Sequence, residues 1–279
     1  QIYNAIAQMR FIAPALDALC DDLKNLEPIN KDHEVNELSI KKSITLNKIS
    51  YYYPNTSEAV LKNINLIIPA HSTVAFVGAT GSGKTTTVDI ILGLLEAQQG
   101  TLQVDDSVIS KINQRNWQRS IGYVPQNIYL ADDTVSANIA FGVDPKRIDQ
   151  NAVEHAAKIA NLHHFVNNEL PLKYQTTIGE RGVRISGGQC QRIGIARALY
   201  HNPQVLVLDE ATSALDNVTE QIVMEAIQKM RNDITIIMIA HRLSTIKKCD
   251  DIFFLENGEI TAQGDFNELK KNNKQFNIL

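Results

Sequence analysis

The chain has 279 residues, of which 44% are hydrophobic and 21% are charged, and its formal net charge is −4. This composition predicts a folded chain with a real core, and the lack of a basic excess argues against nucleic acid as the main partner. Three widely spaced cysteines form neither a disulfide framework nor a metal-binding pattern, which is typical of a reducing compartment.

The first part of the chain differs in character from the rest. Apolar residues recur at helical spacing between residues 6 and 19, which predicts a helix broken near Pro14. Residues 27–42 are charged and polar and predict a linker. Because the chain begins with Gln1 and not with Met, we expect it to be cut from a longer protein. The longest apolar run, Ile234–Ala240, is far shorter than the roughly 20 residues that span a bilayer.

A glycine-rich loop follows three strand-like stretches at residues 43–53, 59–68 and 72–77. The segment Gly78-Ala79-Thr80-Gly81-Ser82-Gly83-Lys84-Thr85 fits the pattern G-x-x-x-x-G-K-[ST], and a helix is expected from Lys84 to Leu95. Glycines let the backbone approach an anion, and the free N–H groups at a helix start bind phosphate oxygens. The loop therefore predicts nucleotide binding, with Lys84 at the β- and γ-phosphates and the Thr85 hydroxyl on Mg²⁺.

Strands and helices alternate in the remainder of the chain. The expected strands are 101–104, 121–124, 204–209, 234–240 and a hairpin at 252–261, and the expected helices are 189–200, 217–231 and one starting at 266. The pattern is helical from residue 134 to about 170, which predicts an inserted helical subdomain over about residues 127–203. We therefore predict an α/β fold, with a P-loop NTPase core, a mainly parallel sheet, an N-terminal antiparallel β part and this subdomain. We expect the hairpin to add to the antiparallel part.

Two acidic residues end the expected strand 204–209. Because ligands bind at the carboxyl edge of a parallel sheet, Asp209 is expected to hold Mg²⁺ directly or through water. Glu210 can orient or deprotonate the attacking water. A solvated helix cap is the plainer interpretation of such a pair.

The motifs occur in an order that resembles a known family. After the glycine-rich loop come Gln126, Ser186-Gly187-Gly188-Gln189, Leu208-Asp209-Glu210, Ser213-Ala214-Leu215-Asp216 and His241. Residues 43–269 thereby resemble the nucleotide-binding domain of the ATP-binding cassette (ABC) transporters. The Ser-Gly-Gly-Gln block is diagnostic, because other P-loop ATPases lack it. Residues 177–182 are similar to the loop by which exporter-type members contact their membrane domain.

The resemblance implies a role for each matching residue. The expected contacts to ATP are Tyr53, which would stack on adenine, Gly78, Ala79, Thr80, Gly81, Ser82, Gly83, Lys84, Thr85, Thr86, Ser186, Gly187, Gly188, Gln189 and Asp216. The expected catalytic residues are Lys84, Gln126, Glu210 and His241, and the expected Mg²⁺ ligands are Thr85, Gln126 and Asp209. Tyr53 could instead be a strand tyrosine, Ser186 a helix N-cap and His241 a structural histidine. Ile185 and Cys190 depart from the family pattern, but neither change removes a phosphate ligand.

The resemblance also implies that one chain holds an incomplete site. In the family, the block at Ser186 binds the γ-phosphate held by a second subunit, so two copies form an ATP-dependent, head-to-tail homodimer. Residues 1–42 would be the end of the last transmembrane helix and a linker. Residues 43–279 would be the ABC domain, at the cytoplasmic face of a bacterial inner membrane, with a transmembrane domain and no nucleic acid as its partner.

Several alternatives remain at this stage. Residues 88–95 and the N-terminal helix are similar to flippases of lipid-linked oligosaccharides in bacteria, and exporters of lipids, drugs or peptides are the alternatives. A soluble ABC ATPase acting on DNA or ribosomes would carry long coiled coils or a second cassette, and neither is seen. A metabolic P-loop kinase would not explain residues 186–189.

Overall fold

The computed structural model describes residues 2–24, 38–54, 56, 58–179, 183–212, 214–240, 242–273 and 276. The chain divides into two units, residues 1–36 and 37–279, and each is described by itself. Most of the expected linker, residues 180–182 of the exporter-like loop, Ser213 and His241 lie outside the described residues.

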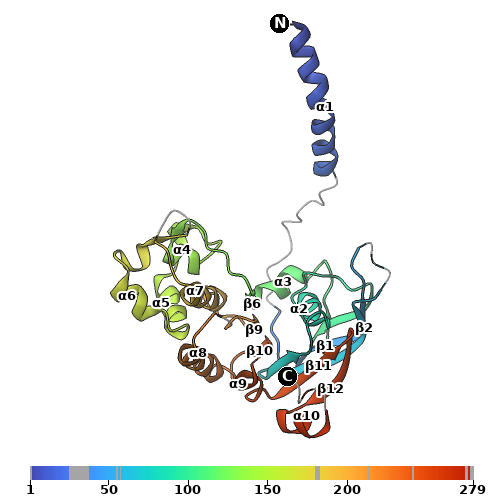
Figure 1. The fold of residues 1–279 in the computed structure, drawn as a ribbon, viewed down its shortest axis with the longest axis vertical. Coiled ribbons are helices and arrows are strands. Elements are labelled where there is room, and N and C mark those ends of the chain that lie inside the picture. The colour runs from blue at the N-terminus through green and yellow to red at the C-terminus, as the bar shows by residue number, and fades with distance from the viewer. Residues whose placement is uncertain are drawn as a thin grey trace. The chain divides into compact units, whose positions relative to one another are not determined.

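In the first unit, the described residues 2–24 form the helix α1 (Ile2–Lys24), shown in Figure 1. This helix is continuous, so the expected break near Pro14 is wrong. A proline removes one N–H donor, and the turns on either side keep their own hydrogen bonds. Leu16 and Leu19 on this helix are more than half exposed, at 58% and 55%. No helix in the described ranges is both long enough and apolar enough to cross a membrane.

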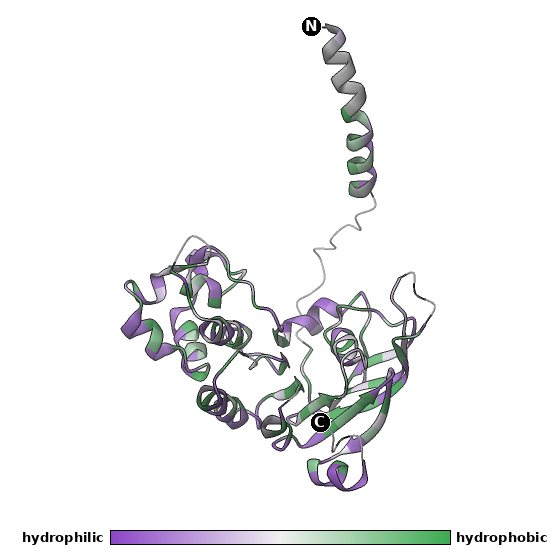
Figure 2. Cartoon of the chain, viewed as in Figure 1, coloured by the Kyte–Doolittle hydropathy of each residue, from purple (hydrophilic) through white to green (hydrophobic). Residues whose placement is uncertain are grey.

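The second unit is built on a six-stranded sheet in the order β12-β11-β3-β10-β9-β6, which is parallel except for β12. Its strands are β3 (Thr73–Val77), β6 (Ile121–Val124), β9 (Val205–Asp209), β10 (Thr235–Ile239), β11 (Asp251–Glu256) and β12 (Glu259–Gly264). Every residue of β3, β9 and β10 is buried, which confirms the expectation that the apolar runs form strands covered on both faces. Figure 2 shows these strands as largely hydrophobic.

The C-terminal hairpin joins this main sheet. Asn257 and Gly258 turn the chain with φ values of 49° and 83°, the positive angles that a tight two-residue hairpin needs. Strand β11 pairs in parallel with β3, so the hairpin extends the main sheet and does not add to the antiparallel part as expected. The helix α10 (Phe266–Asn272) follows it.

An antiparallel sheet in the order β2-β1-β4-β5 packs beside the main sheet and confirms the expected antiparallel part. Its strands are β1 (Ser43–Tyr51), β2 (Leu61–Pro69), β4 (Gln99–Val104) and β5 (Ser107–Val108). Side chains of β3 alternate between two hydrophobic cores. Val74 and Phe76 face the core shared with this sheet, and Ala75 and Val77 face the core shared with the helices.

Helix α2 (Lys84–Ile91) is shorter than expected, because the chain turns at Gly93 with a φ of 67°. Helix α3 (Gln114–Arg119) was not predicted from the sequence, and it places the fully buried Trp117 against the end of α2. The Trp117 indole N–H donates to the carbonyl oxygen of Ile91 at 2.6 Å. This contact fixes the far end of the helix that starts at the glycine-rich loop.

The part of the chain that connects β6 to β9 forms a cluster of helices, on the left in Figure 1, and this inserted helical region was expected. Its elements are α4 (Val135–Ile139), η1 (Pro145–Arg147), α5 (Gln150–Ile159), α6 (His163–Glu169), η2 (Lys173–Gln175) and α7 (Gly187–Leu199). A two-stranded sheet of β7 (Asp133–Thr134) and β8 (Thr177–Ile178) lies within the same region. After β9 come α8 (Asn217–Lys229) and the short α9 (Leu243–Ile246).

Candidate functional site

The glycine-rich loop connects β3 to α2 and depends on glycine at two positions. A methyl group at Gly78 would lie 2.1 Å from the carbonyl oxygen of Leu255, and the φ of Gly78 is 147°. Gly83 is the N-cap of α2 with a φ of 103°, and a methyl group there would lie 2.6 Å from Leu61 Cδ2. Any other residue would therefore strain the backbone that exposes the N–H groups at the start of α2.

Lys84 lies folded over this loop. Its side chain is buried, and its Nζ donates to the carbonyl oxygens of Gly78 at 2.8 Å and Ala79 at 2.9 Å. Burial lowers the pKa of Lys84, and the nearby carboxylates of Glu210 and Asp209 act in the opposite direction. A cation whose hydrogen bonds go to two carbonyl oxygens can exchange them for the oxygens of a phosphate.

The loop also contains a buried polar atom that fits an absent ligand. Among the described residues, Ser82 Oγ is one of two buried side-chain polar atoms that lack a hydrogen-bond partner. A buried hydroxyl normally finds a partner, because leaving it unpaired costs about 1–3 kcal/mol. A phosphate oxygen within the loop would supply one, so the residues present fit a nucleotide.

Three polar side chains converge at the carboxyl edge of the main sheet. Asp209 is the buried last residue of β9, and Glu210 follows it with a φ of 49°, an uncommon angle for a residue other than glycine. The Gln126 Nε2 donates to Glu210 Oε2 at 2.9 Å, across 84 residues of sequence. The structure thereby brings together three of the residues that the sequence analysis assigned to catalysis and metal binding. A backbone held in a sparsely populated conformation is a feature of functional sites.

Tyr123 is a member of this group that the sequence analysis missed. It lies on β6 and forms a side-chain hydrogen bond with Asp209. Burial, followed by the charges of Asp209 and Asp89, raises the pKa of Tyr123 to about 12. The phenol therefore stays protonated at neutral pH, next to the Asp209 carboxylate. The sequence could have indicated this position, because Tyr123 lies on the strand that ends just before Gln126.

A cation at Asp209 would take ligands of several kinds. Among the described residues, no three His, Cys, Asp or Glu side chains form a group that could hold a metal. Thr85 is exposed at the first turn of α2, and Gln126 has an amide oxygen. Hydroxyl, amide and carboxylate oxygens are ligands that Mg²⁺ accepts when a nucleotide supplies the rest.

Tyr53 and Thr86 form a pair at the edge of the loop. Tyr53 is 39% exposed, its hydroxyl lies 3.2 Å from Thr86 Oγ1, and its ring meets the Tyr51 ring edge-on at 5.1 Å. Tyr51 itself is buried, so it is a core residue. Tyr53 therefore presents an aromatic surface next to the start of α2, where a base could stack.

Ser186 caps the helix α7. Its Oγ accepts from the N–H of Gln189 at 3.2 Å, and Gln189 Oε1 accepts from the N–H of Ser186 at 2.7 Å. The Gln189 side chain is therefore used within the cap. The N–H groups of Gly187 and Gly188 remain at the helix start, which favours an anion.

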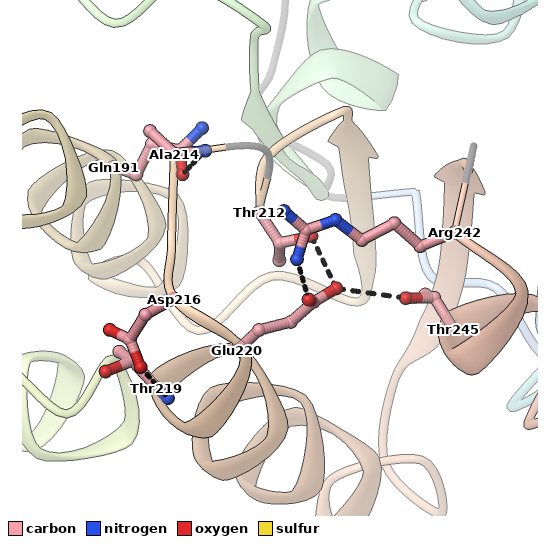
Figure 3. Close-up of polar contacts among 8 residues, drawn as sticks. All are labelled: Gln191, Thr212, Ala214, Asp216, Thr219, Glu220, Arg242 and Thr245. Carbon is pink, nitrogen blue, oxygen red and sulfur yellow. Dashed lines mark hydrogen bonds and ion pairs between the residues drawn. The ribbon is translucent and has the colours of Figure 1, made fainter.

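The segment around Asp216 lies against this helix start. The N–H of Ala214 donates to Gln191 Oε1 at 2.9 Å, and a methyl group at Gly187 would meet the Ala214 side chain at 3.6 Å. Asp216 is the N-cap of α8 and accepts from the N–H of Thr219 at 3.0 Å, as Figure 3 shows. The predicted residues thus form two groups, one around the glycine-rich loop and one at the start of α7. The contact of His241 with either group stays a prediction.

Comparisons with known proteins agree with these motifs. The family model described as ABC transporter matches residues 61–213. A protein of Staphylococcus aureus (strain NCTC 8325 / PS 47), named as a multidrug export ATP-binding/permease protein, is 43% identical over 226 residues, which cover 81% of this chain and 39% of that protein. The ATP-dependent lipid A-core flippase of Saccharophagus degradans is 42% identical over 229 residues, which cover 82% of this chain and 38% of the flippase.

The fold is similar to that of a solved exporter. A bacterial Atm1-family ABC exporter with ATP bound superposes with a TM-score of 0.85 and 32% sequence identity, over 99% of this chain and 47% of that one. The chain spans about two fifths of the length of the curated relatives it matches.

Proposed function

The chain belongs to the ABC transporter family, whose ATP-binding domains are ATPases, and we propose that two copies of it bind and hydrolyse ATP between them to drive export. The observation that carries this proposal is the separation of two phosphate-binding helix starts. Helix α2 begins at the glycine-rich loop beside the antiparallel sheet, and α7 begins within the helical region (Figure 1). Each start is an anion site of the same physical kind, and each is incomplete by itself.

The first group of residues would bind ATP on one chain. The start of α2 and Lys84 would hold the phosphates, Ser82 would donate its unpaired hydroxyl, and Tyr53 would stack on the base. Asp209, Thr85 and Gln126 would hold Mg²⁺, which neutralises phosphate charge when bound. Tyr123 would keep the Asp209 carboxylate oriented toward that cation.

Glu210 would act on the attacking water. Its carboxylate accepts a hydrogen bond from Gln126, which holds the side chain in place, and a carboxylate so held can orient the water and take its proton. Positioning and charge stabilisation dominate phosphoryl transfer, so a held carboxylate supplies much of what the reaction needs. His241 would contact the γ-phosphate beside it.

The second group would complete the site of the partner chain. The exposed start of α7 would bind the γ-phosphate held by the partner's loop, and Asp216 would lie at the seam. The contact of Ala214 with Gln191 supports this assignment, because it couples the Asp216 segment to the α7 start. Hydrolysis would remove the γ-phosphate bridge and open the pair.

The relatives' names support an exporter, and one of them joins an ATP-binding part to a permease, which supports a membrane partner. We assign residues 1–42 to the end of the last transmembrane helix and a linker, and residues 43–279 to the ABC domain, with the helical subdomain over about 127–203. The domain would lie on the cytoplasmic face of a bacterial inner membrane, and its substrate, a lipid-linked molecule or a drug, would be bound by the transmembrane domain.

A mixing experiment tests whether the two groups act on different chains. Lys84→Ala disables the loop, and Ser186→Arg blocks the α7 start, so each variant alone should be inactive. An equal mixture should recover about a quarter of the wild-type rate, because half of the dimers are mixed and each has one complete site. A mixture that stays inactive, or a Ser186→Arg variant that is active alone, would refute the shared site.

A further inference from the structure

One buried carboxylate outside the groups described above connects the segments that carry them. Glu220 lies in the first turn of α8, and its side chain is only 8% exposed. Glu220 Oε1 accepts from Thr212 Oγ1 at 3.0 Å and from Thr245 Oγ1 at 3.2 Å, and Glu220 Oε2 forms an ion pair with Arg242 Nη1. Figure 3 shows the carboxylate at the centre of these contacts.

The three partners come from different parts of the chain. Thr212 follows Glu210 by two residues, in the loop after β9. Arg242 directly follows His241, after β10, and Thr245 lies in α9. The Glu220 carboxylate therefore joins the loop that bears Glu210 to the segment that bears His241.

The same helix is connected to the start of α7. Asp216 caps α8 one turn before Glu220, and the backbone N–H of Glu220 donates to the Asp216 carbonyl oxygen at 2.9 Å. Ala214, two residues earlier, is held by Gln191 of α7. A short path of hydrogen bonds and chain therefore runs from Gln191 of α7 through Ala214 and Asp216 to Glu220.

Two hollows lie next to the partners of this carboxylate. One is lined by Glu210, Thr212, Arg242 and Thr245, among others, and the other by Glu220, Thr245 and Lys248. A close-packed core would fix these loops by shape alone. Beside these hollows, the directed hydrogen bonds of Glu220 hold the Thr212 loop, Arg242 and Thr245 together.

A buried carboxylate is also an unusual choice for a purely structural position. Taking a charge out of water is unfavourable unless its partners compensate, and a packed apolar residue often serves stability as well. Glu220 has a cation and two hydroxyl donors as partners, so it is fully satisfied. This arrangement favours a role in positioning the segments that carry its three partners.

We propose that Glu220 is a positioning residue for ATP hydrolysis, which sets the Glu210 loop and the His241 segment at the correct distance from one γ-phosphate and couples both to the start of α7. The inference rests on the proposed function, since it uses the roles assigned there to Glu210 and His241.

The test compares two glutamates of one helix. Glu220→Gln keeps an oxygen for the two threonine hydroxyls but removes the charge that Arg242 pairs with. Glu225→Gln is the matched control, because Glu225 is exposed and is contacted by Gln221 Nε2 at 2.8 Å. For each variant we would measure kcat, the ATP dissociation constant without hydrolysis, and the melting temperature.

Glu220→Gln should lower kcat about tenfold or more and change the ATP dissociation constant less than about twofold, because small misplacement of reacting groups mainly slows chemistry. Glu220→Asp, which retains the charge, should recover part of the rate, and Glu225→Gln should match the wild type. Should Glu220→Gln fail to fold, Thr245→Val removes one donor to the carboxylate and should show the same split between kcat and affinity.

A wild-type kcat in Glu220→Gln, or equal losses of kcat, affinity and melting temperature in Glu220→Gln and Thr245→Val, would overturn the inference. A wild-type chain without any ATP hydrolysis would count against the proposed function instead.

Discussion

Replacing Lys84 tests most sharply whether the glycine-rich loop binds ATP, because the contribution of Lys84 to ATP affinity can be worked out from its contacts. One charge pair at about 4 Å contributes about 4 kcal/mol at the effective dielectric of a partly buried site. Leaving the carbonyl oxygens of Gly78 and Ala79 offsets about 1–2 kcal/mol of this gain. A net loss of about 2–3 kcal/mol in Lys84→Ala corresponds to a decrease in ATP affinity of about 30–150-fold.

The assay is an equilibrium titration with a fluorescent ATP analogue, and Lys62→Ala is the control because Lys62 is exposed on β2. The ligand-free melting temperature of Lys84→Ala should change little, because the variant loses two hydrogen bonds but also a buried charge. An affinity within about threefold of the wild type, or an equal loss in Lys62→Ala, would refute the reasoning.

The same residue predicts a pH dependence. Burial lowers the pKa of Lys84 below its ordinary 10.5, and bound phosphates would raise it again. ATP binding would then take up a proton, so ATP affinity should fall as pH rises through the lowered pKa toward 10.5. Lys84→Ala should lose this alkaline dependence.

Two further predictions concern stability and are read from denaturant unfolding. Trp117→Phe removes the indole donor to the carbonyl of Ile91 and should lower the free energy of unfolding by about 1–3 kcal/mol while leaving ATP affinity nearly unchanged; an unaltered midpoint would contradict this. Burial acts to raise the pKa of Asp105, but the backbone N–H groups of residues 41–43 at 2.8–2.9 Å bring it below 3.8. Asp105→Asn should therefore destabilise the chain at neutral pH, and its difference from the wild type should shrink as pH falls below 3.8, whereas the exposed Asp106→Asn should show neither effect.

The parts of the fold that could be predicted are those in which local pattern and tertiary environment agree. Strands β3, β9 and β10 are continuous apolar runs, and a run of that kind is stable only between two covered faces. The glycine-rich loop can likewise be recognised from one short stretch of sequence, because its glycines and lysine lie within eight residues, between a strand and a helix.

Other features depend on contacts that no short window contains. Helix α3 has only six residues, too few to show a periodic pattern. Trp117 is buried there because it packs against the end of α2 and donates to the carbonyl oxygen of Ile91. The contact of Gln126 with Glu210 joins positions 84 residues apart. Glu220 lies on an amphipathic helix, where a carboxylate usually faces solvent, and its burial depends on contacts with Thr212, Arg242 and Thr245, which lie elsewhere in the chain.

The central claim is that the catalytic site is shared between two chains, and its most direct test is the rate of MgATP hydrolysis as a function of protein concentration, for the wild type and for Glu210→Gln. The account predicts that turnover of the wild type rises more than linearly with concentration. It also predicts that Glu210→Gln is inactive and sediments as a dimer in ATP. Strictly linear turnover that survives Glu210→Gln would mean that one chain holds a complete site, and it would contradict the account.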